Sequence, residues 1–140
     1  MDLLALEVTD SPSAEALKRV GDALGAFNEG DVGPADRRAL AVFVRDVDDT
    51  LVAGLSGHTA WGWLYVQWLW VAEDQRGHGL AGRMLFAAED EARARGCHGA
   101  HIDTFNPHAL GVYQRAGYTV FGSLPDFPKG RTRSFLSKTL

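Results

Sequence analysis

The residue types best suited to chemistry lie in one stretch, where an apolar run ending at Val71 is followed by a polar loop and three glycines. Glycines that open a helix let an anion approach the unpaired amides of its first turn, where the helix dipole is positive. The guanidinium of Arg76 would add a fixed charge with a planar donor fork. The stretch predicts a phosphate cradle made of Arg76, Gly77, His78, Gly79, Leu80, Ala81 and Gly82. The open alternative is a loop shaped by glycine, with Arg76 solvated.

The spacing of Gly77, Gly79 and Gly82 also matches the dinucleotide fingerprint, and Asp103 follows at about the expected 20 residues. NAD binding is therefore an alternative on the motif alone. Three features count against it. Residues 72–76 separate the strand from the first glycine, about half of the chain precedes the motif, and too few residues follow it for the remaining strands of such a fold.

A second segment downstream contains Asn106, then Tyr113, then Gly117 and Tyr118. Together with the run Arg76-Gly77-His78-Gly79-Leu80-Ala81, it resembles the paired Q/R-x-x-G-x-G/A and N…Y-x-x-x-G-F/Y signatures of the GNAT superfamily of acyl-CoA N-acyltransferases. The resemblance covers residues 61–121 well and the flanks by element order only. It implies acetyl-CoA as the acyl donor, with its pyrophosphate on the amides of residues 76–82.

The resemblance also implies roles for residues outside the glycine loop. The backbone of Leu69, Trp70 and Val71 would contact the pantetheine arm, where the central strands splay apart. Tyr113 would be the general acid that protonates the departing thiolate, with core packing as its alternative role. Asn106 would contact CoA or a bound water, and capping of the following helix is an equally weighted and compatible role.

The general base stays unassigned. Many relatives carry a glutamate in the middle of the central strand, whereas residues 64–68 contain no carboxylate. Tyr65, His58 and Asp103 are candidate substitutes, as is bulk water. The tryptophans between residues 61 and 70 are expected either to line an acceptor pocket or to pack in the core.

These observations favour an N-acetyltransferase in which a primary amine attacks acetyl-CoA directly in a ternary complex. The acceptor amine belongs either to a small molecule or to a protein. The alternative is an inactive acyl-CoA-binding sensor of the same fold. A homodimer is the state that the resemblance suggests.

The elements that must position these residues form one expected domain, residues 1–140. We expect an α/β fold with a GNAT-like mixed sheet of about six to seven strands and about four flanking helices, with the central strands splayed at the CoA site. Expected strands are residues 3–8, 40–45, 50–55, 61–71, 98–104, 118–122 and 133–138, and expected helices include 14–27, 77–95 and 107–115. Strict alternation would place Trp63 and Tyr65 on one face of the central strand, opposite Trp68 and Trp70.

Composition excludes several classes of protein. The chain has 140 residues, 46% of them hydrophobic and 23% charged, which is ordinary for a globular domain. The net charge of −4 argues against nucleic acid as the main partner. A single cysteine, Cys97, excludes an internal disulfide and a multi-cysteine zinc site, and no metal is assigned to the histidines. There is no basic leader and no uncharged apolar stretch of about 20 residues, so we expect a cytoplasmic protein without a membrane partner.

Overall fold

The computed structural model describes residues 3–140, which divide into two compact units. The first ends at Ala35 and the second runs from Asp36 to Leu140. Each unit is described by itself. No helix within residues 3–140 is long and apolar enough to cross a membrane.

The N-terminal unit holds one helix, α1 (Ala14–Val32). The helix begins at the N-cap Ser13, whose Oγ accepts a hydrogen bond from the amide of Ala16 at 3.0 Å. The strand expected over residues 3–8 is wrong, because the structure leaves this segment without regular structure. A strand needs a neighbouring edge for its backbone groups, and the leucines and the valine of this segment are each more than 90% exposed.

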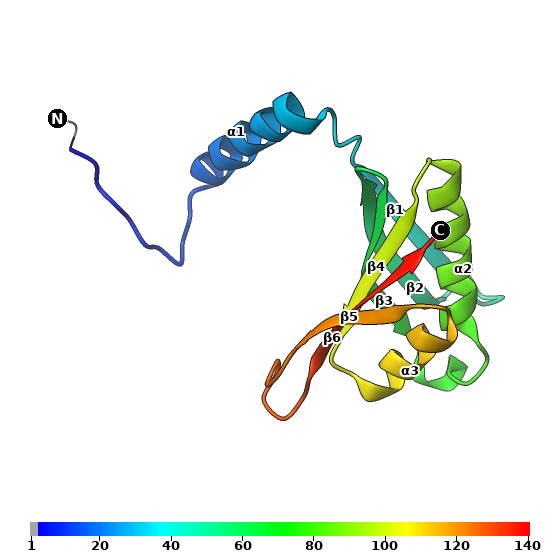
Figure 1. Ribbon diagram of the computed structural model, residues 1–140. Coiled ribbons are helices and arrows are strands. Elements are labelled where there is room, and N and C mark those ends of the chain that lie inside the picture. The colour runs from blue at the N-terminus through cyan, green and yellow to red at the C-terminus, as the bar shows by residue number, and fades with distance from the viewer. Residues whose placement is uncertain (1–2) are drawn as a thin grey trace. The chain divides into compact units, whose positions relative to one another are not determined.

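The second unit is built on a six-stranded mixed sheet in the order β1-β2-β3-β4-β6-β5 (Figure 1). Only β3 and β4 pair in parallel. The strands are β1 (Arg38–Arg45), β2 (Leu51–Ala60), β3 (Trp63–Val71), β4 (Gly99–Thr104), β5 (Thr119–Leu124) and β6 (Arg133–Thr139). The expected mixed α/β sheet is confirmed with six strands. The described residues hold three α-helices rather than about four.

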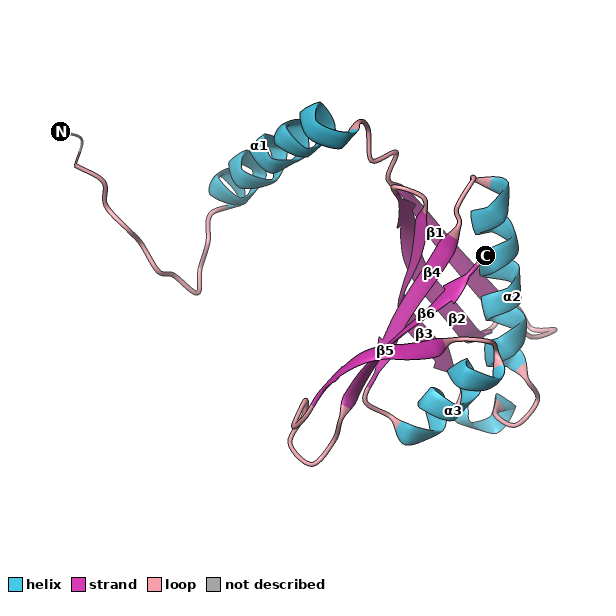
Figure 2. Ribbon diagram, in the orientation of Figure 1, coloured by secondary structure: helices cyan, strands magenta, loops and turns pink. Residues whose placement is uncertain are grey.

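Two of those helices, α2 (Leu80–Ala94) and α3 (Pro107–Arg115), pack on one face of the sheet (Figure 2). Helix α2 contacts β1, β2 and β3, and α3 contacts β4 and α2. The buried side of α2 presents Met84, Leu85, Ala88 and Ala92 to the core. A short 3-10 helix, η1 (Glu73–Gln75), precedes α2, so α2 begins three residues later than expected.

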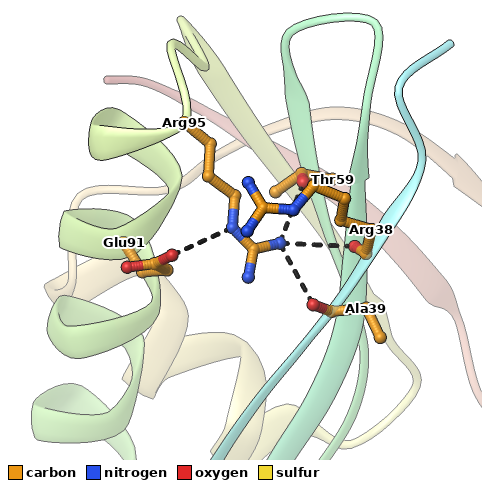
Figure 3. A network of polar contacts seen from close by, with 5 residues as sticks. All are labelled: Arg38, Ala39, Thr59, Glu91 and Arg95. Carbon is orange, nitrogen blue, oxygen red and sulfur yellow. Dashed lines mark hydrogen bonds and ion pairs between the residues drawn. The ribbon is translucent and has the colours of Figure 1, made fainter.

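Arg95 ties the end of α2 to the first two strands (Figure 3). Its Nε donates to Glu91 Oε1 at 3.0 Å within the same helical turn. Its Nη1 donates to Thr59 Oγ1 and to the carbonyl of Ala39, both at 3.1 Å. One guanidinium therefore fixes the position of α2 over the edge of the sheet that β1 and β2 form.

A β-bulge at Gln67 changes which residues of β3 share a face. Ser56 of β2 pairs with Trp68 and the adjacent Gly57 pairs with Val66, so Gln67 has no partner on β2. Gly57 is required there, because a Cβ at this position would lie 1.9 Å from the carbonyl oxygen of Tyr65. The strict alternation expected from the sequence is therefore wrong beyond Val66.

The bulge places Leu69 and Val71 against the core. It moves Trp68 and Trp70 to the face that already carries Trp63 and Tyr65, and leaves these two indoles 66% and 50% exposed. The face of the sheet opposite α2 is consequently aromatic along the whole length of β3.

The parallel strands β3 and β4 separate after a short pairing. Their register runs from Trp63 with Gly99 to Val66 with Ile102 and ends there. Strand β3 continues to Val71 and β4 to Thr104, so residues 67–71 have no strand beside them on the β4 side. In this gap, the main chain of residues 67–71 lacks a neighbouring ladder on the β4 side.

Candidate active site

A cleft of about 500 Å³ lies where the separated end of β3 meets the N-terminus of α2 and one side of α3. Its walls are mainly apolar, and the glycine loop forms one end. The predicted site residues that line it are Leu69, Val71, Arg76, Gly77, Gly79, Leu80, Ala81, Gly82 and Tyr113. The two sequence segments singled out by their motifs therefore face the same space.

Three predicted site residues lie outside the walls of this cleft. Trp70 projects from the opposite face of β3, and His78 is exposed in the loop. Asn106 is the N-cap of α3, and its Oδ1 accepts hydrogen bonds from the amides of His108 at 2.9 Å and Ala109 at 3.1 Å. The capping role considered for Asn106 is the one its contacts support.

Sequence reasoning missed the side of α3 that completes the cleft. Ala109, Val112 and Ala116 line it together with Tyr113. These positions follow the i, i+3, i+4, i+7 spacing of one helix face, so the placement of Tyr113 in the site could have identified them. Gln75, His108 and Arg115 lie at its rim and add polar groups.

The glycine loop has the conformation that a phosphate cradle requires. Gly77 and Gly79 have φ values of +81° and +75°, and a Cβ at either position would meet nothing within 4 Å. Gly79 is the N-cap of α2, and the first turn of α2 contains no acidic residue. The open approach, the positive dipole end and the absence of a competing carboxylate in this turn together suit an anion.

Arg76 also stabilises the loop. Its Nε donates to the carbonyl of Val71 at 3.1 Å, which ties the loop back to the end of β3. Arg76 also lines the cleft. The Arg76 side chain therefore has a structural hydrogen bond within the loop in addition to the phosphate contact expected of it.

Tyr113 is buried on α3 at the inner end of the cleft. The pKa of its hydroxyl is raised to about 12, mainly by burial and secondly by the negative charge of Asp103. The hydroxyl is consequently protonated at neutral pH.

The three candidate bases lie together on the aromatic face. Tyr65 donates to Asp103 Oδ2 at 3.3 Å, and the ring of His58 lies edge-on to Tyr65 with centroids 5.6 Å apart. Arg133 Nη1 donates to Asp103 Oδ1 at 2.8 Å. His101, which sequence reasoning set aside, stacks on Tyr65 with centroids 4.7 Å apart and 19° between the planes.

The rest of the described chain offers little other chemistry. Among residues 3–140, no three His, Cys, Asp or Glu side chains gather as metal ligands would. Cys97 is buried, and burial raises the pKa of its thiol. A buried, protonated thiol is a poor nucleophile.

Comparisons with known proteins point to one family. Residues 7–118 match the acetyltransferase (GNAT) family. The chain is 47% identical over 131 residues to acetyltransferase Atu2258 of Agrobacterium fabrum, covering 94% of this chain and 96% of the relative. It is 45% identical over 91 residues to the blasticidin-S acetyltransferase of Streptomyces morookaense, covering 64% and 67%. A crystal structure from Agrobacterium tumefaciens, described as that of an acetyltransferase, matches with a TM-score of 0.92 and 45% identity over 98% of this chain and all of that one.

Proposed function

The chain belongs to the GNAT family of acetyltransferases, and from this premise we propose that it transfers the acetyl group of acetyl-CoA to a primary amine by direct attack in a ternary complex. One observation carries the proposal. The glycine loop, Leu69 and Val71 at the separated end of β3, and Tyr113 on α3 all line one cleft, which supports this function.

The cleft suits acetyl-CoA along its whole length. The amides from Arg76 to Gly82 would hold the pyrophosphate, and the open Cβ positions of Gly77 and Gly79 allow close approach. The free backbone edge of Leu69, Trp70 and Val71 would bind the pantetheine arm as an added strand binds. The apolar side chains of Leu69, Val71 and Val112 would cover its methylene groups.

The same elements supply the chemistry of transfer. A backbone N–H on the free edge of β3 would polarise the thioester carbonyl, and one such preformed donor contributes about 3–4 kcal/mol in comparable sites. The amine attacks the carbonyl carbon, a C–N bond forms and the C–S bond breaks. The Tyr113 hydroxyl would donate to the sulfur as negative charge develops there.

Thermal unfolding with acetyl-CoA, CoA or NAD tests the donor. Acetyl-CoA at about 100 times its dissociation constant should add about 2.7 kcal/mol to the stability of the protein, and NAD should add nothing. Gly79→Ala should weaken this effect, because the substitution strains the positive φ at the N-cap of α2. Gly96→Ala is the matched control, since Gly96 has a φ of +85° and lies beyond the other end of α2.

Release of CoA with blasticidin S and with simple primary amines then tests the transfer. The proposal requires amine-dependent release. Stabilisation by acetyl-CoA without release for any amine would instead indicate the sensor function. Stabilisation by NAD and not by acetyl-CoA would overturn both the transferase and the sensor function. Blasticidin S is the first acceptor to try, because a relative 45% identical over 91 residues bears the name of an acetyltransferase for it.

We further propose that the protein is a homodimer paired through α1. Leu17, Val20, Leu24 and Phe27 follow the 3-4-3 spacing of a helical seam and are 56–72% exposed. An antiparallel pair of these helices would set Lys18 and Arg19 of one copy near the acidic end of the other, whose last turn has no base. A second copy therefore matches the helix in both apolar spacing and charge.

Light scattering during size-exclusion chromatography tests this pairing. Leu24→Glu should shift the protein from dimer to monomer, because it buries a charge in the seam. Ala26→Glu on the opposite face of α1 should leave the dimer intact. A monomeric wild-type protein, or equal effects of the two substitutions, would contradict the proposal.

A further inference from the structure

We propose that His101 accepts the proton of the acceptor amine, and that Tyr65, Asp103 and Arg133 position its ring beside the gap between β3 and β4. The inference rests on the proposed acetyl transfer and assigns the base that transfer needs. No carboxylate stands on β3 to do this work. The imidazole lies on the neighbouring strand instead.

The ring of His101 is held from two sides. Tyr65 pairs with it across the parallel ladder and stacks on it with centroids 4.7 Å apart. Trp63 lies edge-on with its centroid 6.0 Å away. Tyr65 is itself anchored by its hydrogen bond to Asp103, and Asp103 by its ion pair with Arg133. A chain of contacts over β3, β4 and β6 thus fixes the plane of the imidazole.

Contacts within the protein leave the ring nitrogens of His101 available. Across residues 3–140, the side chain of His101 makes ring contacts, and neither of its ring nitrogens forms a hydrogen bond within the protein. Asp103, by contrast, already accepts hydrogen bonds on both carboxylate oxygens. The His101 imidazole is therefore better placed than the Asp103 carboxylate to take a proton from the acceptor amine.

The cluster lies next to the place where the strands separate. The last paired residues are Val66 and Ile102, so His101 comes one residue before the last pair and Asp103 is the first residue of β4 in the gap. Tyr113 on α3 lines the cleft together with Leu69 and Val71, the β3 residues beyond the last pair. An amine coming from the aromatic face would thus meet a thioester held on the other face.

Burial favours a neutral His101 in the free protein. Burial lowers its pKa below the ordinary value of 6.5, and Asp103 partly opposes this effect. The other titratable or charged groups around the cluster are His58 on β2, Arg37 before β1, Tyr65 on β3, His98 before β4 and Arg133 on β6. A neutral imidazole can accept a proton at pH 7, and the carboxylate of Asp103 then stabilises the imidazolium.

The protons balance as follows. A protonated amine gives its first proton to His101, which passes it to solvent through its half-exposed ring. The free amine attacks the thioester and the C–S bond breaks. The thiolate takes the proton of Tyr113, and the second proton lost by the new amide nitrogen restores Tyr113. The products are the amide, CoA and one released proton.

The aromatic rings on the sheet face that carries His101 indicate the class of acceptor. Trp63, Tyr65, Trp68 and Trp70 share this face through the bulge at Gln67. Flat π-faces favour a cationic or ring-bearing organic amine over a plain aliphatic one. We assign the site to small amines of that kind, of which benzylamine is a simple probe.

The test compares two amines in two variants. His101→Phe keeps a ring against Tyr65 and removes the proton acceptor. It should lower kcat for benzylamine, which is protonated at pH 7, by about 100-fold or more. It should change little for hydroxylamine, which is already neutral at that pH. His98→Phe is the matched control, since His98 contacts Trp63 but lies outside the positioned cluster.

A pH profile gives a second readout. At saturating benzylamine, kcat of the wild type should fall as the pH drops below 6.5, when His101 becomes protonated, and the His101→Phe variant should lack this acidic limb. Equal losses of kcat for the two amines in His101→Phe, or a loss no larger than in His98→Phe, would overturn the role of His101. Either result would leave the proposed acetyl transfer standing. A wild-type protein that binds acetyl-CoA but acetylates neither amine would overturn the proposed function and this inference together.

Discussion

Lys138→Met should destabilise the protein by about 3–5 kcal/mol, because it leaves the carboxylate of Glu89 buried without a positive partner. Glu89 is 1% exposed on the inner side of α2. Its Oε1 accepts a hydrogen bond from Lys138 Nζ at 2.7 Å, and its Oε2 accepts one from the Tyr118 hydroxyl at 2.9 Å. Urea unfolding measures the loss.

The size of the effect comes from the position of this network. Lys138 on β6 also donates to the carbonyl of Ala116 at the end of α3, at 2.9 Å. One ammonium group therefore links β6, α2 and α3. Burial, and next the charge of Glu89, raise the pKa of Tyr118, so its hydroxyl stays protonated in the fold. The stability from that protonated hydroxyl is fully present below the ordinary tyrosine value of 10.0 and is lost as the pH rises beyond the raised value.

A double variant separates the buried charge from the packing. Glu89→Leu combined with Lys138→Met removes both charges and should recover most of the lost stability, since an apolar pair in such a place is often neutral. Glu89→Leu alone leaves the ammonium unpaired but partly exposed, so it should cost less than Lys138→Met. A double variant as unstable as Lys138→Met would show that shape, not charge, dominates at this position.

The cleft was predictable because its chemistry is encoded locally. The glycine loop and the Tyr113 segment each carry their own short motif, and both motifs sit directly after strands that bring them to one edge of the sheet. Helical spacing extends the prediction from Tyr113 to Val112 and Ala116. The structure brings these segments to one cleft, and the roles of their residues stay predictions.

The acceptor face was not predictable in the same way. Its composition depends on a single unpaired residue, Gln67, which inverts every later side chain of β3. No turn signal or propensity marks that position in the sequence. The contact between Tyr65 and His101 depends on the register of a parallel pair, and periodicity within either strand does not reveal that register.

Residues 3–8 show that a strand predicted from composition need not form. Their composition is that of a strand, and the sequence alone favours one. Backbone propensity forms a strand only when another edge accepts its hydrogen bonds, and the N-terminal unit of a single chain offers no such edge within its described residues. The β-strand propensity of this segment therefore has no neighbouring strand edge with which to pair.

Tyr113→Phe should lower kcat for acetyl transfer by about 100-fold or more while leaving the thermal shift with acetyl-CoA unchanged. The substitution keeps the buried ring on α3 and removes only the hydroxyl of this cleft-lining residue. Tyr118→Phe is the matched control, because it removes a hydroxyl that bonds Glu89 outside the cleft. That control should lower stability and spare kcat.

The raised pKa of Tyr113 defines how its hydroxyl can act. At about 12, the phenol is a weaker acid than free tyrosine, so full proton transfer to a thiol of ordinary pKa near ~8.5 is uphill. The hydroxyl therefore stabilises the thiolate mainly by donating a hydrogen bond, and the transfer is completed as the amide nitrogen gives up its second proton. Because Tyr113 stays protonated through pH 10, kcat should show no alkaline limb below that pH from this residue. An alkaline limb near pH 9 that disappears in Tyr113→Phe, or an unchanged kcat in that variant, would contradict this role.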